Sequence, residues 1–167
     1  MKRLLAFILV IVICIFMCSC DPASFSIDRD SLNDVISIDL IEYKNSNQKE
    51  FSTWVPNQFD KLIPFVPANA TIIETLPSEK ISDFLDAFTE TDILHTYYAY
   101  NSPKDICIRL NYENGNFLII WANYAINTFR GYIGEYSSDG SVLFFWGCFS
   151  SLTHYEDLVN QYFSYKI

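Results

Sequence analysis

The chain has 167 residues, with 20 acidic against 11 basic side chains and a formal net charge of −9 at pH 7. So acidic a chain repels phosphate backbones, and without a basic run or an arginine cluster it is not expected to bind nucleic acid. The length suits one domain with a core of its own rather than two.

The first twenty residues have the order of a secretory signal. Lys2 and Arg3 form a basic start, residues 4–17 are all apolar, and the small Ser19 precedes Cys20. As a helix the apolar run reaches only about 21 Å, against roughly 30 Å of membrane hydrocarbon. A cleaved signal peptide over residues 1–19 is therefore predicted, with an uncleaved anchor and an ordinary secreted protein as alternatives.

The end of this signal, Met17-Cys18-Ser19-Cys20, resembles the lipobox of bacterial lipoproteins, with Met17 where leucine is usual and Cys18 at the middle position. The resemblance implies that Cys20 carries diacylglycerol and anchors the chain to the extracytoplasmic face of the cell membrane. Two acyl chains suffice for stable anchoring. Cleavage would also remove Lys2 and Arg3, which leaves 9 basic and 20 acidic residues, a net charge of −11.

Residues 20–33 are polar without sustained periodicity, and we expect a flexible tether there, followed by a single domain over residues 34–167. Alternation over 34–43 predicts the first strand. Residues 50–70 mix apolar side chains with three prolines, which indicates a long packed loop that is either functional or conceals an element.

A short strand over 71–76 is expected next, followed by a helix capped by Ser78, with one apolar stripe made of Ile81, Phe84, Leu85 and Phe88. Residues 93–100 are rich in strand formers and predict another strand. The helix stripe should face the sheet.

The segment 105–121 predicts a hairpin, because Asn114-Gly115 favours a two-residue turn. That turn would pair Tyr112 with Phe117 and Ile108 with Trp121, placing these residues on one buried face. The opposite face is half polar, so we expect partial cover or a recognition surface there.

A second hairpin is expected from 130–136 and 141–149, across the turn 137–140, and its last strand is apolar on both faces. A capping box from Thr153 to Glu156 then starts a second amphipathic helix. The elements predict an α+β fold, with an antiparallel sheet of about five to seven strands and two amphipathic helices packed on one face.

Residues suited to catalysis are few. His95 and His154 are the only histidines, no zinc-type spacing or GxSxG motif occurs, and five glycines leave little scope for phosphate loops. We therefore predict no cofactor, no metal site and no catalytic residue. Cys148 near His154 is a candidate nucleophile, and the sequence leaves open whether Cys107 and Cys148 form a disulfide.

Aromatic residues are abundant, with 14 Phe, 11 Tyr and 3 Trp. Most of them would suit a core, but tyrosine and tryptophan also serve recognition surfaces well. The candidate binding residues are Tyr97, Tyr98, Tyr100 and Trp146.

The whole chain resembles small uncharacterised lipoproteins of Gram-positive gut bacteria, through the signal and stretches such as IDLIEYKN, LPSEKISDFLDAF and SSDGSV. We therefore expect a lipid-anchored extracytoplasmic domain that binds a protein or glycan of the cell envelope. The alternatives are an extracytoplasmic hydrolase with a site near His95 and the loop 50–70, and an inhibitor or immunity-type protein.

Overall fold

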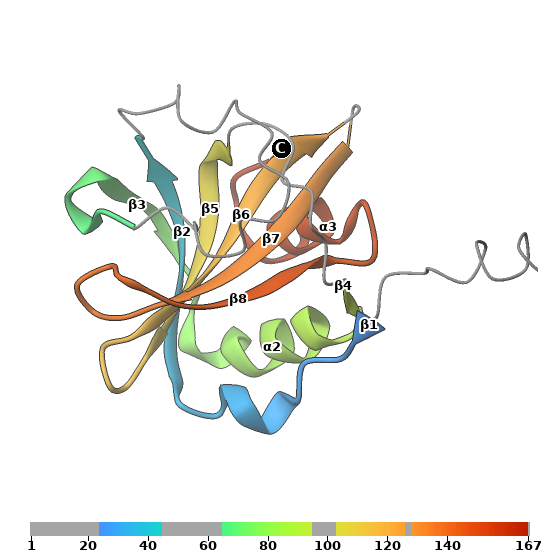
Figure 1. Cartoon of the computed structure of the whole chain (residues 1–167), viewed down its shortest axis with the longest axis horizontal. Coiled ribbons are helices and arrows are strands. Elements are labelled where there is room, and N and C mark those ends of the chain that lie inside the picture. Colours follow the sequence, from blue (N-terminus) through green and yellow to red (C-terminus); the bar gives the residue numbers. More distant parts are fainter. Residues whose placement is uncertain (1–23, 45–64, 95–102, 126–127, 167) are drawn as a thin grey trace, which may run out of the picture.

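The computed structural model describes residues 24–44, 65–94, 103–125 and 128–166 (Figure 1). Several predictions lie outside these residues: lipid attachment at Cys20, the candidate sites at His95, Tyr97, Tyr98 and Tyr100, and most of the loop 50–70.

The described chain forms one antiparallel sheet of eight strands in the order β1-β4-β8-β7-β6-β5-β2-β3, together with two α-helices. The α+β prediction is confirmed, and the strand count exceeds the expected five to seven because the two-residue strand β1, which was not predicted, extends one end of the sheet. The strands are β1 (Ser24–Phe25), β2 (Val35–Tyr43), β3 (Ala70–Thr75), β4 (Ile93–Leu94), β5 (Pro103–Tyr112), β6 (Phe117–Ala125), β7 (Thr128–Tyr136) and β8 (Val142–Phe149). The helices are α2 (Ile81–Thr89) and α3 (His154–Tyr162), with 3-10 turns η1 (Arg29–Leu32), η3 (Pro67–Asn69) and η4 (Ser78–Lys80).

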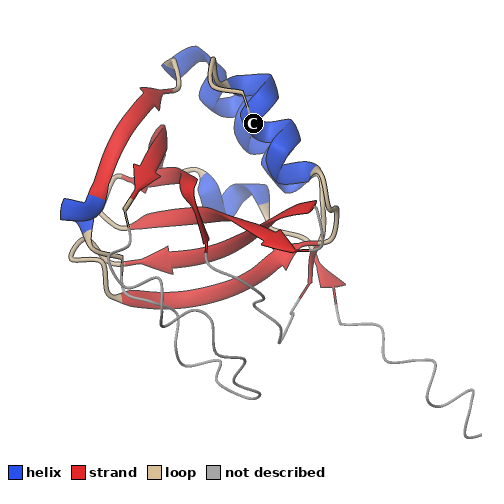
Figure 2. Ribbon diagram, turned by 90° about the horizontal axis from the view of Figure 1, so that it is seen from above, coloured by secondary structure: helices blue, strands red, loops and turns tan. Residues whose placement is uncertain are grey.

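Both α-helices pack on the same side of the curved sheet, as Figure 2 shows. The predicted stripes face inward: Phe84, Leu85 and Phe88 from α2 and Leu158 and Val159 from α3 are buried there. They pack against the sheet residues whose side chains point to the helix side, including Ile38, Leu40, Ile108, Leu110, Leu118, Ile120 and Ile133. This helix-side cluster is the main core.

A second apolar cluster lies on the opposite face of the sheet. Its buried members are Ile41, Tyr43, Phe65, Cys107, Phe117, Ile119, Trp121, Tyr132, Tyr136 and Cys148. Rings pack on one another here, and the Trp121 indole N–H donates to the Tyr136 hydroxyl at 3.1 Å. The sheet therefore has an apolar cluster on each side, and we call this one the far-side cluster.

The predicted register of the β5–β6 hairpin is wrong by one residue. The Tyr112 N–H donates to the Asn116 carbonyl, so the loop has three residues and ends with Gly115 at φ +84°. This is the turn-plus-bulge alternative to a two-residue loop. Arg109 therefore lies opposite Ile119 and Ile108 opposite Ile120. A shift of one residue moves every β6 side chain to the other face.

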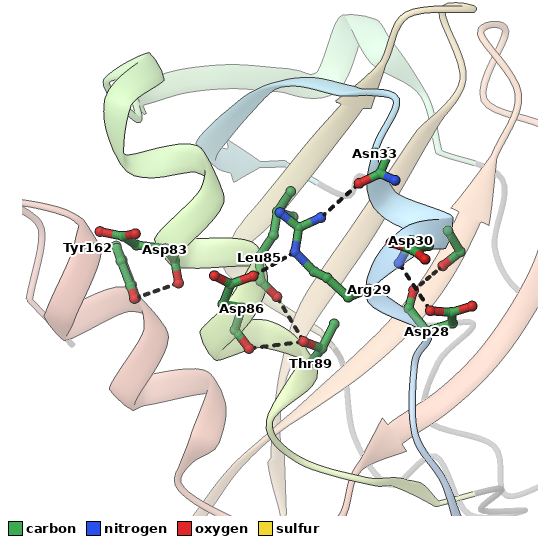
Figure 3. Close-up of polar contacts among 10 residues, drawn as sticks. Asp28, Arg29, Asp30, Asn33, Asp83, Leu85, Asp86, Thr89 and Tyr162 are labelled. Atoms are coloured by element: carbon green, nitrogen blue, oxygen red, sulfur yellow. Dashed lines mark hydrogen bonds and ion pairs between the residues drawn. The ribbon is translucent and has the colours of Figure 1, made fainter.

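The predicted tether is wrong for residues 24–33, because they belong to the packed structure. Ser24 and Phe25 pair with β4, and Ile27 and Leu32 are 5% and 2% exposed. Polar contacts fix η1 against α2: Arg29 Nε lies 2.7 Å from Asp86 Oδ1 (Figure 3). The apolar side chains Ile27 and Leu32 pack in the main core together with residues of α2 and the sheet.

Both helices begin differently from the prediction. Ser78 lies in the turn η4, and no side chain of the described residues caps η4 or α2. The Thr153 hydroxyl donates to the Asp157 carboxylate at 3.0 Å and accepts no hydrogen bond from a backbone N–H at the start of α3, so the expected capping box with Glu156 is absent. The amphipathic stripes, and not the caps, identified the helices correctly.

Candidate binding surface

An aromatic row crosses the helix side of β8. The Trp146 ring centroid lies 6.2 Å from that of Phe25 on β1 and 5.2 Å from that of Phe144, the latter edge to face. Phe144 at the end of the row is 50% exposed, whereas Trp146 is partly buried. Phe144 is thus the most exposed ring of a row whose other rings are partly buried.

Two bulges in β8 and the glycine Gly147 set the directions in which the side chains of this row point. The register between β7 and β8 shifts at Ile133/Gly134 and again at Glu135/Tyr136, which inserts Trp146 and Leu143 as extra residues. Bulges of this kind bend a strand and redirect its side chains. Gly147 has φ +126°, and a Cβ there would lie 2.3 Å from the Leu94 carbonyl oxygen. Glycine thus allows β4 to approach β8 directly beside Trp146.

A carboxylate lies beside the exposed ring. Glu135 on β7 is the register partner of Phe144 and of Leu118, so its side chain is on the helix side. Burial, and then the neighbouring charges of Glu135 and Asp34, raise the pKa of Tyr112 well above its ordinary value. The resulting surface consists of Phe144, Trp146, Glu135 and Tyr112.

The structure places one of the four predicted binding residues, Trp146, in this surface, although not as its exposed part. The Trp146 indole N–H is buried and finds no acceptor among the described residues. Phe144, which sequence reasoning did not single out, is the most exposed ring of the surface. The sequence of β8 is apolar on both faces, which indicated that one face could be exposed. The bulges that decide which ring is exposed cannot be recognised from the alternation of apolar and polar residues.

The far side of β2 and β5 holds a buried polar network that sequence reasoning also missed. Asp39, 4% exposed, accepts hydrogen bonds from Thr75 Oγ1 at 2.7 Å and from Arg109 Nη2 and Asn111 Nδ2, both at 2.8 Å. The Asn111 amide also donates to the Ser37 hydroxyl at 2.9 Å. The carboxylate is thus fully engaged by neighbouring side chains, and we assign this network a structural role.

Cys107 and Cys148, the two cysteines among the described residues, are buried thiols in the far-side cluster. Successive registers join Cys107 to Trp121, Trp121 to Tyr132, and Tyr132 to Cys148. Three strand spacings separate the two thiols, roughly 14 Å along the sheet, whereas a disulfide needs Cα atoms within about 7 Å. The strand order therefore places Cys107 and Cys148 too far apart to form a disulfide.

His154 begins α3 on the helix side, with its ring edge to face on Phe149 at 4.5 Å. The ring is half-buried, and burial lowers the pKa of His154 despite an opposing hydrogen bond with the Phe88 backbone. Cys148 lies in the far-side cluster. The sheet therefore separates the thiol from the imidazole, which excludes a Cys-His nucleophile.

Within the described residues, no group of three or more His, Cys, Asp or Glu side chains is arranged to hold a metal ion. No helix in the same part of the chain has the length and apolar character needed to cross a membrane.

A hollow of about 310 Å³ lies between η1 and the start of α2, lined by residues that include Arg29, Leu32, Ser78 and Ser82.

No family model, curated protein or solved structure matches this chain. The candidate surface therefore has to be interpreted from its own chemistry.

Proposed function

We propose that this chain is a lipid-anchored binding domain on the extracytoplasmic face of the cell membrane, which recognises a protein or glycan of the cell envelope. The observation that carries the proposal is the half-exposed Phe144 ring at the end of a fixed aromatic row. Full burial of such a ring is worth about 1.5 to 3 kcal/mol, so leaving it in water forgoes stability that a partner can recover.

The membrane location rests on the sequence. The basic start, the apolar run and the lipobox-like Met17 to Cys20 support a lipid on Cys20. The acidic net charge opposes nucleic-acid partners and anionic head groups, so the lipid would supply the membrane contact.

The hydrolase alternative depends on His95 and on the loop 50–70, and His95 and residues 50–64 lie outside the described residues. In the described part, the buried carboxylate Asp39 is engaged by three donors and His154 is separated from Cys148. The inhibitor alternative would need a protruding loop, and no described element favours it over a binding sheet surface.

Two measurements on the full chain expressed in a bacterium test the proposal. The mass of the N-terminal peptide should show a diacylated Cys20, which Cys20→Ala abolishes; an intact Met1 would contradict the lipid anchor. Separately, the detergent-extracted chain should bind purified cell envelopes, and Phe144→Ser should remove that binding.

The matched control for the second measurement is Ile72→Ser. Ile72 is 53% exposed on β3, at the opposite edge of the sheet from β1, so it removes a similar exposed apolar side chain far from Phe144. Envelope binding that Phe144→Ser and Ile72→Ser change equally would refute the assignment of the binding surface.

A further inference from the structure

We propose that the surface made of Phe144, Trp146, Glu135 and Tyr112 binds a basic segment of a partner protein, with a lysine or arginine side chain lying on Phe144 and paired with Glu135. This rests on the proposed function and names its ligand class.

The first support is the position of the carboxylate. Glu135 and Phe144 are opposite each other on adjacent strands, an arrangement that brings Cβ atoms to about 4.5 to 5.5 Å. The ring is half exposed and Glu135 is partly exposed. A cation placed over the ring would therefore also reach the carboxylate, so a cation–π contact and an ion pair would act together.

The second support is charge. Among the ion pairs of the described side chains, which exclude those of residues 103–105 and 123–130, none involves Glu135. The carboxylates of Glu135 and Asp34 both act on neighbouring Tyr112 and raise its pKa. The whole chain carries a net charge of −9, so its field attracts a basic partner and repels an acidic one.

The third support separates a peptide from a glycan. Sugars stack on open faces of tryptophan or tyrosine and need hydrogen-bonding groups around them. Here the Trp146 ring packs between Phe25 and Phe144, and its N–H is buried. The exposed ring is a phenylalanine, which offers no hydrogen bond. A cation uses what this surface presents better than a neutral sugar does.

The test uses the full chain in neutral detergent and a fluorescein-labelled peptide of alternating lysine and alanine, with binding followed by anisotropy. The same peptide with glutamate for lysine is the negative probe. We expect Glu135→Gln and Phe144→Leu each to weaken lysine-peptide affinity about threefold to tenfold, the range of a partly exposed cation–π or ion-pair contact.

Two variants serve as controls. Glu156→Gln removes the same charge from a partly exposed glutamate on α3 and should leave the affinity within about twofold. Phe144→Trp keeps a larger ring in place and should retain or strengthen binding. Equal weakening by Glu135→Gln and Glu156→Gln would show diffuse attraction by the acidic surface, and would overturn the proposal.

Failure of this proposal can be told apart from failure of the proposed function. Binding of a neutral oligosaccharide that Phe144→Ser abolishes, without lysine-peptide binding, would overturn the basic-segment proposal and keep the binding domain. Absence of binding to the peptide, the oligosaccharide and the envelopes would overturn both.

Discussion

Replacing Asp39 by asparagine removes one charge from a buried pair while the side chain keeps its shape. Asp39 accepts from Thr75, Arg109 and Asn111, and an asparagine amide in its place must turn its NH2 group toward one of these donors. The Arg109 guanidinium, 18% exposed, would lose its carboxylate, and its Nε already has no acceptor among the described residues.

Removing one partner of a buried ion pair costs about 3 to 5 kcal/mol, and the partial exposure of Arg109 places the expectation near 3 kcal/mol. With a urea m-value of about 2 kcal/mol/M, the unfolding midpoint should fall by about 1.5 M. Tryptophan fluorescence can follow the transition, because Trp121 is buried in the far-side cluster.

The double variant Asp39→Asn with Arg109→Met isolates the cause. Methionine removes the unpaired charge and fills much of the same space, so the double variant should be more stable than Asp39→Asn alone. A loss below about 1 kcal/mol for Asp39→Asn, or a double variant no more stable than the single one, would refute the assignment of a structural ion pair.

Three further outcomes are expected. Gly140→Ala should destabilise by over 2 kcal/mol in thermal unfolding, and Gly115→Ala by only about 1 to 2 kcal/mol, because a Cβ at Gly140 meets a backbone oxygen at 1.7 Å while the nearest atom at Gly115 is 3.6 Å away; equal losses would contradict the close approach. In urea unfolding, Leu32→Ala should cost about 2 to 5 kcal/mol because Leu32 is buried, and Arg29→Ala should cost under about 1 kcal/mol because its ion pair is exposed. Negligible losses for both variants would instead support a flexible tether over residues 24–33. Hydrogen bonds from Ser137 and Ser141 lower the pKa of Asp139 to about 2, so its contribution is present above its ordinary pKa near 4 and is lost as the pH falls through about 2. Asp139→Asn should therefore reduce the fall in Tm between pH 4 and pH 2, and an unchanged acid slope would contradict this role.

The sequence by itself determined the order of the longer strands and helices from residue 35 onward and the faces of both helices. Their spacing places Phe84, Leu85 and Phe88 on one stripe of α2, and a helix buries such a stripe by turning it toward the sheet. The second hairpin followed from its turn residues in the same way. The absence of common catalytic motifs could also be read from composition, because those motifs need particular residues at particular spacings.

Only the tertiary structure decided the register of the β5–β6 hairpin and the composition of the candidate surface. Asn114-Gly115 fits either a two-residue or a three-residue loop, and the buried residues of both sheet faces select the second, which moves Ile119 and Ile120 to opposite sides from those expected. Exposure of Phe144 depends on bulges in β8, and its pairing with Glu135 depends on a neighbouring strand. Such features arise from contacts between separate segments, so local periodicity cannot contain them.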